Sequence, residues 1–434
     1  MTDTPKRVAL ATFGCKVNQY ESACIAQQFT DRGWAVVPFS QQADVYVINS
    51  CTVTGQADAT SRKAIRRALD RKAENPRVKV AVTGCWAQRF PERALAVGDV
   101  DLVCGNREKA RLFELLESGA RVACSHIADA DCFDEMSADR LPGRSRAFVK
   151  VQDGCDFGCA YCAVHIARGP SRSRPLAAIV DQVERLAAHG YREIVLGGIN
   201  LGLWRDGERG IPALAHRLAE VDGIERVRLS SLEPQFLSPA FVDELFACNA
   251  VARHLHVPLQ SGSDDLLRAV GRRYDTALFR RHMEYVLSCE PHCALGFDVI
   301  VGLPGEMDER FAETLDFLRN TDFTYLHVFA YSRRPGTPAA TMPGHVHGAT
   351  VKERSRILSE LSDEKSAAYR QRLLRDSIPL WAVAETHENG LATGLSDHWV
   401  RVCARTDGDV LRGVPVHERD GGLELRESTQ PEKP

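Results

Sequence analysis

The sequence predicts an α/β protein of three consecutive parts, and three observations support this. The first part repeats a strand followed by a helix, which is the pattern of a doubly wound parallel sheet. The central part repeats the same unit six times, as in a partial (β/α)6 barrel. The last part offers about five short strands separated by turn dipeptides, which is typical of a small antiparallel β-barrel. We therefore expect domains at residues 1–140, 141–375 and 376–434.

Length and composition agree with several domains of ordinary globular character. The chain has 434 residues, 44% hydrophobic and 26% charged, which argues against wholesale disorder, a collagen-like repeat and a coiled coil. The formal net charge of −3 gives no global basicity that would indicate a nucleic-acid partner. No apolar run approaches the roughly 20 residues of a membrane-spanning helix, and no signal-peptide core is present. We expect a cytoplasmic protein without a membrane partner, in which clustered cysteines indicate metal or redox chemistry.

In the first part, apolar runs that are each followed by a helical stretch predict parallel strands. These runs are Val8–Phe13, Val45–Ile48 and Val78–Val82. Asn18 and Glu21 have the spacing of a capping box at the start of the first helix, and Gly33 is expected to end that helix. The polar stretch Asp129–Arg146 is a predicted linker to the central part.

The central part contains six predicted strands with helical runs between them, and one long charged helix is expected to follow at Val351–Leu374. The six strands are Phe148–Val151, Glu193–Leu196, Arg226–Leu229, His254–Leu259, Leu295–Val301 and Tyr325–Phe329. The last part, Ile378–Arg426, is divided into short strands by Asn389-Gly390, Asp407-Gly408 and Gly421-Gly422.

The clearest chemical motif is Cys155-x3-Cys159-x2-Cys162, which follows the first strand of the central part. Three thiolates on one loop can converge on a single metal centre and leave one coordination position open. In a (β/α) barrel the active site lies at the carboxyl ends of the strands, and this loop is at such an end. The alternative is a Cys3His zinc site completed by His165.

A second set of cysteines lies in the first part, where Cys15, Cys51 and Cys85 each follow a predicted strand. The carboxyl ends of parallel strands share one edge of a sheet, so these three side chains are expected to meet. Three unrelated buried thiols are the alternative interpretation.

The motif with Tyr161 before its last cysteine resembles the radical S-adenosylmethionine enzymes. The resemblance implies that Cys155, Cys159 and Cys162 hold a [4Fe-4S] cluster whose fourth iron chelates S-adenosylmethionine. Reductive cleavage of that cofactor then yields a 5′-deoxyadenosyl radical. The resemblance also implies that the cofactor is contacted by Gly197, Gly198, Gln260, Ser261, Ile300, Val301 and Gly302.

Both cysteine sets together resemble the methylthiotransferase family over nearly the whole chain. The motifs that carry this resemblance are Thr12–Gln19, Ile48–Thr54, Val82–Gln88, Val257–Ser263 and Val328–Thr337. Gly14–Asn18 and Cys51–Thr54 are typical of the branch that acts on N6-threonylcarbamoyladenosine beside the tRNA anticodon.

The resemblance implies that Cys15, Cys51 and Cys85 hold an auxiliary [4Fe-4S] cluster that bears the sulfur to be transferred. One S-adenosylmethionine then methylates that sulfur and another supplies the radical that activates adenine C2, with electrons from a separate electron donor. Two other interpretations remain open: a ribosomal-protein methylthiotransferase, and a zinc-stabilised RNA-binding protein without redox chemistry.

A tRNA partner requires local positive charge. One predicted helix carries Arg62, Lys63, Arg66, Arg67, Arg71 and Lys72. Arg168, Arg172 and Arg174 follow the cysteine loop and are further candidates for phosphate contacts. The last part resembles the small RNA-binding barrel called the TRAM domain, yet Ser377–Pro434 holds 6 Lys and Arg against 10 Asp and Glu.

Overall fold

The computed structural model describes residues 5–427, and the chain divides into two compact units. Unit 1 comprises Met1–Pro142, Lys150–Arg174 and Ser332–Ala340. Unit 2 comprises Gly143–Val149, Pro175–Tyr331 and Thr341–Pro434. The last seven residues of the domain expected at 376–434 lie outside the described residues.

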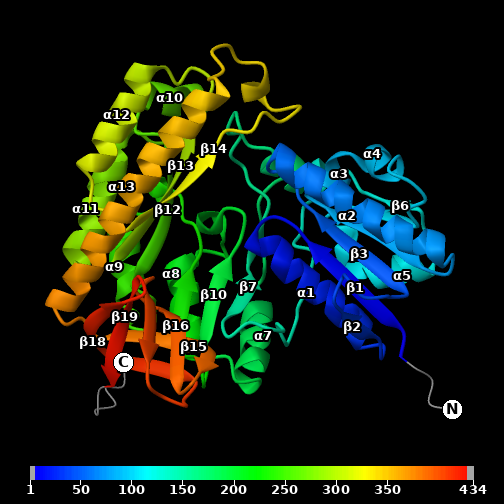
Figure 1. Ribbon diagram of the computed structural model, residues 1–434, viewed down its shortest axis with the longest axis horizontal. Coiled ribbons are helices and arrows are strands. Elements are labelled where there is room, and N and C mark those ends of the chain that lie inside the picture. Colours follow the sequence, from blue (N-terminus) through cyan, green and yellow to red (C-terminus); the bar gives the residue numbers. More distant parts are fainter. Residues whose placement is uncertain (1–4, 428–434) are drawn as a thin grey trace. The chain divides into compact units, whose positions relative to one another are not determined.

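Unit 1 is built on a six-stranded sheet of order β2-β1-β3-β4-β5-β6, in which every pairing is parallel (Figure 1). Its strands are β1 (Arg7–Thr12), β2 (Ala35–Val37), β3 (Val45–Ser50), β4 (Lys79–Gly84), β5 (Leu102–Cys104) and β6 (Val122–Ala123). Its helices are α1 (Lys16–Thr30), α2 (Gly55–Glu74), α3 (Cys85–Arg89), α4 (Pro91–Leu95), η1 (Glu108–Arg111), α5 (Leu112–Glu117) and η2 (Ile127–Asp129). The antiparallel pair β8 (Gln152–Asp153) and β9 (Arg172–Ser173) also belongs to this unit, as do α6 (Val164–Arg168) and η5 (Pro338–Ala340).

The strand order of unit 1 creates a switch point between β1 and β3. From this point the chain winds outward in both directions, so right-handed crossovers place α1 and α2 on opposite faces of the sheet. The α2 side is packed by Ala64, Ile65 and Ala68 against Ile48 and Val82 of the strands. The predicted doubly wound parallel sheet is thus present.

One expectation for unit 1 is wrong, and a second is confirmed only in part. Asn18 and Glu21 do not form a capping box, because α1 begins at Lys16 and both side chains are buried inside the unit. Asp129–Arg146 does contain a boundary between the two units, at Pro142 and Gly143. Its first part is packed into unit 1, because Met136, Ala138 and Leu141 are buried and Tyr20 donates a hydrogen bond to the Met136 carbonyl at 2.7 Å. Helix capping was inferred from spacing alone, and tertiary burial overrides it.

Unit 2 contains the six strand and helix repeats expected from the central part. Its strands form two three-stranded sheets of order β11-β10-β7 and β12-β13-β14. They are β7 (Ala147–Lys150, the last residue in unit 1), β10 (Glu193–Gly197), β11 (Arg226–Leu229), β12 (His254–Gln260), β13 (Ala294–Val301) and β14 (Tyr325–Ala330). The helices are α7 (Leu176–Ala188), η3 (Leu201–Leu203), α8 (Ile211–Ala219), η4 (Pro234–Phe236), α9 (Pro239–Phe246), α10 (Asp264–Ala269), α11 (Thr276–Cys289), α12 (Asp308–Arg319) and α13 (Gly348–Arg375).

The C-terminal strands close into a barrel of order β15-β16-β17-β19-β18. They are β15 (Leu380–Glu388), β16 (Leu391–Ser396), β17 (Arg401–Ala404), β18 (Val410–Arg419) and β19 (Gly422–Glu427). Asn389 and Gly390 both have positive φ, at 53° and 73°, as a two-residue hairpin turn requires. The barrel shares one apolar core with Tyr369 and Leu373 of α13.

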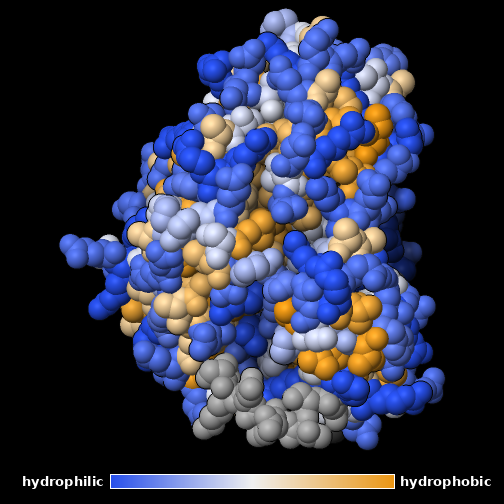
Figure 2. Space-filling model, turned by 90° about the vertical axis from the view of Figure 1, so that its left-hand side faces the viewer, coloured by the Kyte–Doolittle hydropathy of each residue, from blue (hydrophilic) through white to orange (hydrophobic). Residues whose placement is uncertain are grey.

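No helix in the range 5–427 is long and apolar enough to cross a membrane. The face seen in Figure 2 is mostly hydrophilic, and its hydrophobic residues gather in separate patches.

Candidate functional site

Cys15, Cys51 and Cys85 lie at the carboxyl ends of three neighbouring strands of unit 1, as the sequence predicts. Cys51 and Cys85 directly follow β3 and β4, and Cys15 closely follows β1. Cys15 and Cys51 therefore lie at the switch point between β1 and β3. A Cβ on Gly14 would lie 2.6 Å from the Cys51 sulfur, which places the Gly14-Cys15 turn against Cys51. Ligands in open α/β sheets bind at this edge.

Gly84 is required for the approach of Cys85 to its neighbours. Its φ is +97°, and a Cβ there would lie 2.2 Å from the Ser50 carbonyl oxygen. The Ser50 hydroxyl fixes the same contact, because it donates to the Thr83 carbonyl at 2.5 Å and accepts from the Ala87 amide at 3.2 Å. Only glycine lets the two cysteine-bearing strand ends come this close.

Among residues 5–427, neither cysteine set is drawn together as tightly as a single zinc ion requires. Tetrahedral zinc at about 2.3 Å from each sulfur would hold the sulfurs about 3.8 Å apart. Among residues 5–427, neither cysteine set, with or without His165, forms a group whose ligand atoms lie within 4.8 Å of one another. The geometry of a closed Cys3His zinc site at Cys155, Cys159, Cys162 and His165 is therefore not formed among the described residues.

The second cysteine set lies on the loop between β8 and α6. Backbone amides of Phe157 and Val164 point at the sulfurs of Cys155 and Cys162, both at 3.4 Å. Burial raises the pKa of the Cys162 thiol to about 11. A positively charged iron centre would favour the thiolate, and amide hydrogen bonds to sulfur would tune such a centre.

A buried ion network lies beside the first cysteine set. The Glu21 carboxylate forms ion pairs with Lys109, with Lys150 at 3.0 Å and with Arg168 at 2.8 Å. All four side chains are at most 3% exposed. Asp153 meets Lys150 at 2.9 Å, Arg168 at 2.9 Å and Arg172 at 3.7 Å. Burial alone would raise the pKa of Glu21, but the charges of Arg168, Lys109 and Lys150 outweigh it and hold that pKa well below its usual value.

This network carries more positive than negative charge. Four cations face two carboxylates, and Asp134, a further carboxylate near the network, is itself paired with Arg107 at 3.3 Å. Arg168 is fully buried, and its Nε has no hydrogen-bond partner among the described residues. Part of this excess positive charge lies close to the cysteines. Desolvation raises the pKa of Cys15, and the charge of Arg168 opposes this by lowering it. Uncompensated buried charge is costly, so an anionic group such as a thiolate-ligated iron–sulfur cluster fits here.

Residues 332–337 also hold the first cysteine set in place. The Arg334 side chain, 3% exposed, donates to the Thr52 hydroxyl at 3.2 Å and pairs with Asp58. The Ser332 hydroxyl accepts from the Gly55 amide at 3.0 Å. This motif therefore fixes the segment that follows Cys51, across more than 270 residues of sequence.

The structure corrects the expectation that Arg168, Arg172 and Arg174 contact phosphates. All three are at most 5% exposed, and Arg174 pairs with Glu135. Such side chains are not accessible to a polyanion. On α2, Lys63, Arg66 and Arg67 are exposed, whereas Lys72 is engaged with Asp99 and Asp101.

The seven residues expected to contact S-adenosylmethionine lie in unit 2, at or just beyond the carboxyl ends of β10, β12 and β13. Gln260 is buried and has a φ of +65°, a strained conformation of the kind found at functional sites. Gly197 has a packing reason for lacking a side chain, since a Cβ would lie 1.8 Å from the Phe148 ring. The Ser261 hydroxyl is engaged locally with Thr314 at 3.2 Å.

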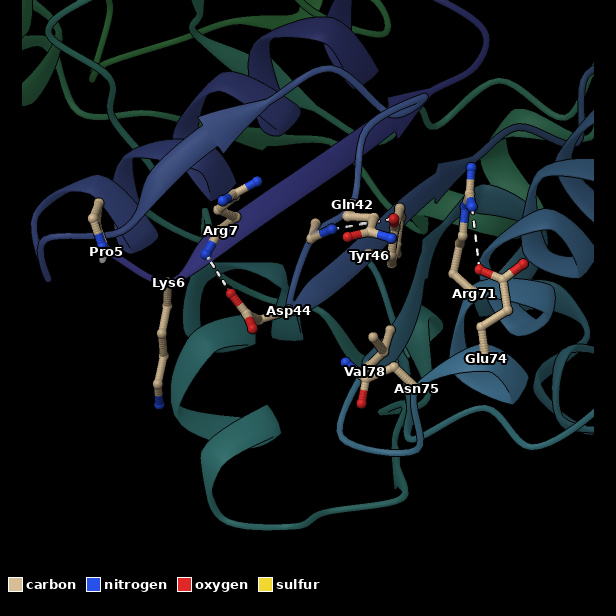
Figure 3. A pocket seen from close by; sticks show the side chains of 11 residues that line it. Pro5, Lys6, Arg7, Gln42, Asp44, Tyr46, Arg71, Glu74, Asn75 and Val78 are labelled. Carbon is tan, nitrogen blue, oxygen red and sulfur yellow. Dashed lines mark hydrogen bonds and ion pairs between the residues drawn. The ribbon is translucent and has the colours of Figure 1, made fainter. Parts of the chain in front are cut away.

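A pocket of about 360 Å³ opens at the opposite edge of the unit 1 sheet. It is lined by residues near the amino ends of β1, β3 and β4, including Arg7, Asp44, Tyr46 and Val78 (Figure 3). Arg7 and Asp44 close part of it through a 2.7 Å hydrogen bond. None of the cysteines lines this pocket, so it is separate from the candidate site.

Comparison with known proteins supports this assignment. Residues 7–105 match the description "Uncharacterized protein family UPF0004", and residues 149–318 match "Radical SAM superfamily". A threonylcarbamoyladenosine tRNA methylthiotransferase of Bacillus subtilis is 36% identical over 93% of this chain and 91% of its own length. The chain belongs to the radical S-adenosylmethionine methylthiotransferases.

Other relatives of this methylthiotransferase carry two different names. A threonylcarbamoyladenosine tRNA methylthiotransferase of Thermotoga maritima is 34% identical over 91% of both chains. A tRNA-2-methylthio-N(6)-dimethylallyladenosine synthase of Cereibacter sphaeroides is 32% identical over 91% of both chains. In fold, the chain resembles the radical S-adenosylmethionine methyltransferase TsrM of Kitasatospora setae, with a TM-score of 0.57 and 17% identity over 77% of this chain and 75% of that one.

Sequence reasoning missed the buried network around Glu21 and the anchoring role of Arg334. Charged residues are usually exposed to solvent, and no periodic pattern in the sequence distinguishes the buried charged residues from the exposed ones. A usable signal was that Asn18, Arg168 and Arg334 lie within or next to the cysteine motifs and the family-like motifs.

Proposed function

We propose that this methylthiotransferase transfers a methylthio group to C2 of N6-threonylcarbamoyladenosine beside the anticodon of tRNA. The names of the relatives from Bacillus subtilis and Thermotoga maritima support this substrate. The motifs Gly14–Asn18 and Cys51–Thr54, typical of that branch, support it independently.

The proposal includes two [4Fe-4S] clusters, one held by Cys15, Cys51 and Cys85 and one by Cys155, Cys159 and Cys162. The observation that carries the first cluster is the excess buried positive charge next to Cys15, which three neutral thiols would leave uncompensated. Backbone amides directed at Cys155 and Cys162 support the second.

Each part of the chain has a distinct task in this proposal. Residues 1–140 hold the sulfur-bearing cluster, 141–375 bind S-adenosylmethionine, and 376–434 contact RNA in the manner of a TRAM domain. When bound, the second cluster and S-adenosylmethionine supply the one-electron chemistry that a C–H bond without an acidic proton needs. Gly197, Gly198, Gln260, Ser261, Ile300, Val301 and Gly302 position the cofactor, and a separate protein donates electrons.

In this proposal, the RNA contacts the exposed cations of α2 and the closed C-terminal barrel. Lys63 and Arg66 are exposed on α2 and are suited to phosphate contacts. The barrel contributes hydrogen bonds and shape more than charge, since its region is net negative. A tRNA substrate also implies the cytoplasm as the place of action.

The deciding experiment is mass spectrometry of tRNA nucleosides after anaerobic reaction of the reconstituted protein. We expect 2-methylthio product from tRNA that contains threonylcarbamoyladenosine and none from tRNA that contains dimethylallyladenosine. Product from the dimethylallyl substrate, or from a ribosomal protein, would replace the proposed substrate.

A triple variant with Cys15, Cys51 and Cys85 changed to Ala tests the assignment of the first cluster. It should form no methylthio product while still cleaving S-adenosylmethionine to 5′-deoxyadenosine. Full methylthiolation by this variant would show that the first cysteine set does not carry the sulfur.

A further inference from the structure

Three side chains on adjacent strands of unit 2 form a group apart from both cysteine sets. His256 of β12, Asp298 of β13 and His327 of β14 each offer one ligand atom, and these atoms lie within 4.8 Å of one another. Among residues 5–427 no other group of three or more His, Cys, Asp or Glu side chains is drawn together this closely.

The parallel register explains why the group is held rigidly. Asp298 lies directly opposite His327 between β13 and β14, and opposite Pro258, two residues after His256, between β13 and β12. Side chains two residues apart in a strand point to the same face. All three therefore project from one face of a hydrogen-bonded sheet, which is a more precise support than a loop.

The distances within the group suit a shared cation. One oxygen of Asp298 lies 2.7 Å from Nε2 of His256 and 3.4 Å from Nδ1 of His327. Ligands about 2.1 Å from one ion and at roughly right angles are about 3 Å apart. The side chains of His256 and Asp298 are 11% and 20% exposed, and that of His327 is 49% exposed. One side of the group is thus accessible to water or to an oxygen ligand.

The surroundings of His256 also favour this interpretation. Its Nδ1 lies 3.0 Å from the Tyr325 hydroxyl, which in turn lies 2.9 Å from Nε2 of His254. The phenol has one proton, so it donates to one ring and accepts from the other. When the phenol donates to His254, it accepts a hydrogen bond from the protonated Nδ1 of His256. In a neutral His256 ring, the lone pair of Nε2 then faces the Asp298 carboxylate. In that arrangement either a further proton on Nε2 or a metal cation must lie between these two groups. A hydrogen-bonded second nitrogen is usual for a metal-binding histidine.

We propose that His256, Asp298 and His327 bind one divalent transition-metal ion of borderline softness, such as Zn²⁺ or Fe²⁺. Two imidazoles and one carboxylate suit such ions, and the open side leaves room for water or for a carboxylate or phosphate oxygen. This site is independent of the proposed substrate and of both cysteine sets.

The test uses the full chain with both clusters loaded, so that the cysteines are occupied, in anaerobic equilibrium dialysis against Zn²⁺. The zinc and iron contents per chain are each measured in the same sample by inductively coupled plasma mass spectrometry. We expect one zinc per parent chain, and at least about tenfold weaker binding in the variants His327→Ala and Asp298→Asn. The matched control His189→Ala, which removes an exposed histidine of unit 2, should bind zinc as the parent does.

X-ray absorption at the zinc edge identifies the ligands directly. The expected spectrum has nitrogen and oxygen neighbours at about 2.0–2.1 Å and no sulfur shell at about 2.3 Å. A sulfur shell, or zinc binding unchanged in both variants, would overturn the proposal. Thermal unfolding and circular dichroism that match the parent show that the variants are folded, and His327→Ala alone suffices if Asp298→Asn does not fold.

Discussion

Arg168 joins segments of unit 1 that are far apart in the sequence. Its guanidinium donates to Asn18 at 2.8 Å and pairs with Glu21 and Asp153, so it ties α1 to the hairpin that leads into the second cysteine loop. The same charge acts on Cys15. One residue thus connects both cysteine sets.

Replacing Arg168 by Gln is expected to weaken the first cluster site, because the site then loses the positive charge that acts on Cys15 and the charged donor that holds Asn18. We expect the iron content to fall by about half, because one of the two proposed clusters is lost. Arg168→Lys keeps the positive charge but loses the fork-shaped guanidinium donor. Its iron content should lie between that of the parent and that of Arg168→Gln. Iron analysis and electron paramagnetic resonance measure this, with the exposed Arg185→Gln as the control. Full iron and an unchanged spectrum in Arg168→Gln would contradict the assignment.

Glu21→Gln tests the same network through its pH dependence. The pKa of Glu21 is held below its usual value of 4.5, so its ion pairs contribute fully above that pH and are lost as the pH falls. We expect the variant to lose about 3–5 kcal/mol of unfolding free energy at pH 7. The difference from the parent should shrink below pH 4.5. Urea unfolding across this range measures it.

The exposed pair of Glu117 with Lys79 supplies a control for that measurement. Glu117→Gln should cost less than about 1 kcal/mol at any pH. A difference for Glu21→Gln that does not change with pH would show that the carboxylate's charge is not what stabilises the unit.

At the scale of elements, the two cysteine sets occupy different segments of one unit. The first follows three sheet strands, and the second lies on a loop between β8 and α6. Changing Cys155, Cys159 and Cys162 together to Ala is therefore expected to leave about half the iron and no activity. Iron and sulfide analysis of the anaerobically purified variant measures this. Retention of all the iron would mean that these residues are not the ligands.

The exposed face of α2 is expected to contribute ion pairs to tRNA. Lys63→Glu with Arg66→Glu should weaken tRNA binding and flatten its dependence on salt, because each lost phosphate contact removes released counterions. The control carries the same charge change on α13, as Lys352→Glu with Arg356→Glu. Affinity across a salt series compares them, and equal slopes in both variants would place the RNA elsewhere.

These elements also show what the sequence can and cannot predict. A strand such as β3 is recognised because Val45–Ile48 form a continuous, buried apolar run. The cysteines were placed correctly because parallel strands share one carboxyl edge. Glu21 and Arg168 were misread because local spacing resembles a cap or a phosphate-binding patch, and only tertiary contacts show that they are buried against each other.

At the scale of the whole molecule, the C-terminal barrel is part of the structure of unit 2. Leu380, Leu411 and Leu425 of the barrel share a core with Tyr369 and Leu373 of α13. A chain that ends at Ser377 would expose that side of α13, and we expect unit 2 to lose at least about 3 kcal/mol of stability. Thermal unfolding and limited proteolysis measure this. A truncated chain as stable as the parent would show that the barrel is an independent attachment.

The contact of Arg334 with Thr52 and Asp58 has a consequence for synthesis on the ribosome. The chain elongates at roughly 5–20 residues per second, so the segment from Ser332 onward is made roughly 15 to 55 seconds after Cys51 is made. During that interval the nascent chain carries exposed thiols without the residues that fix their geometry. We therefore expect iron to bind stably at the proposed first cluster site only after residues 332–337 have been made, late in the synthesis of the polypeptide.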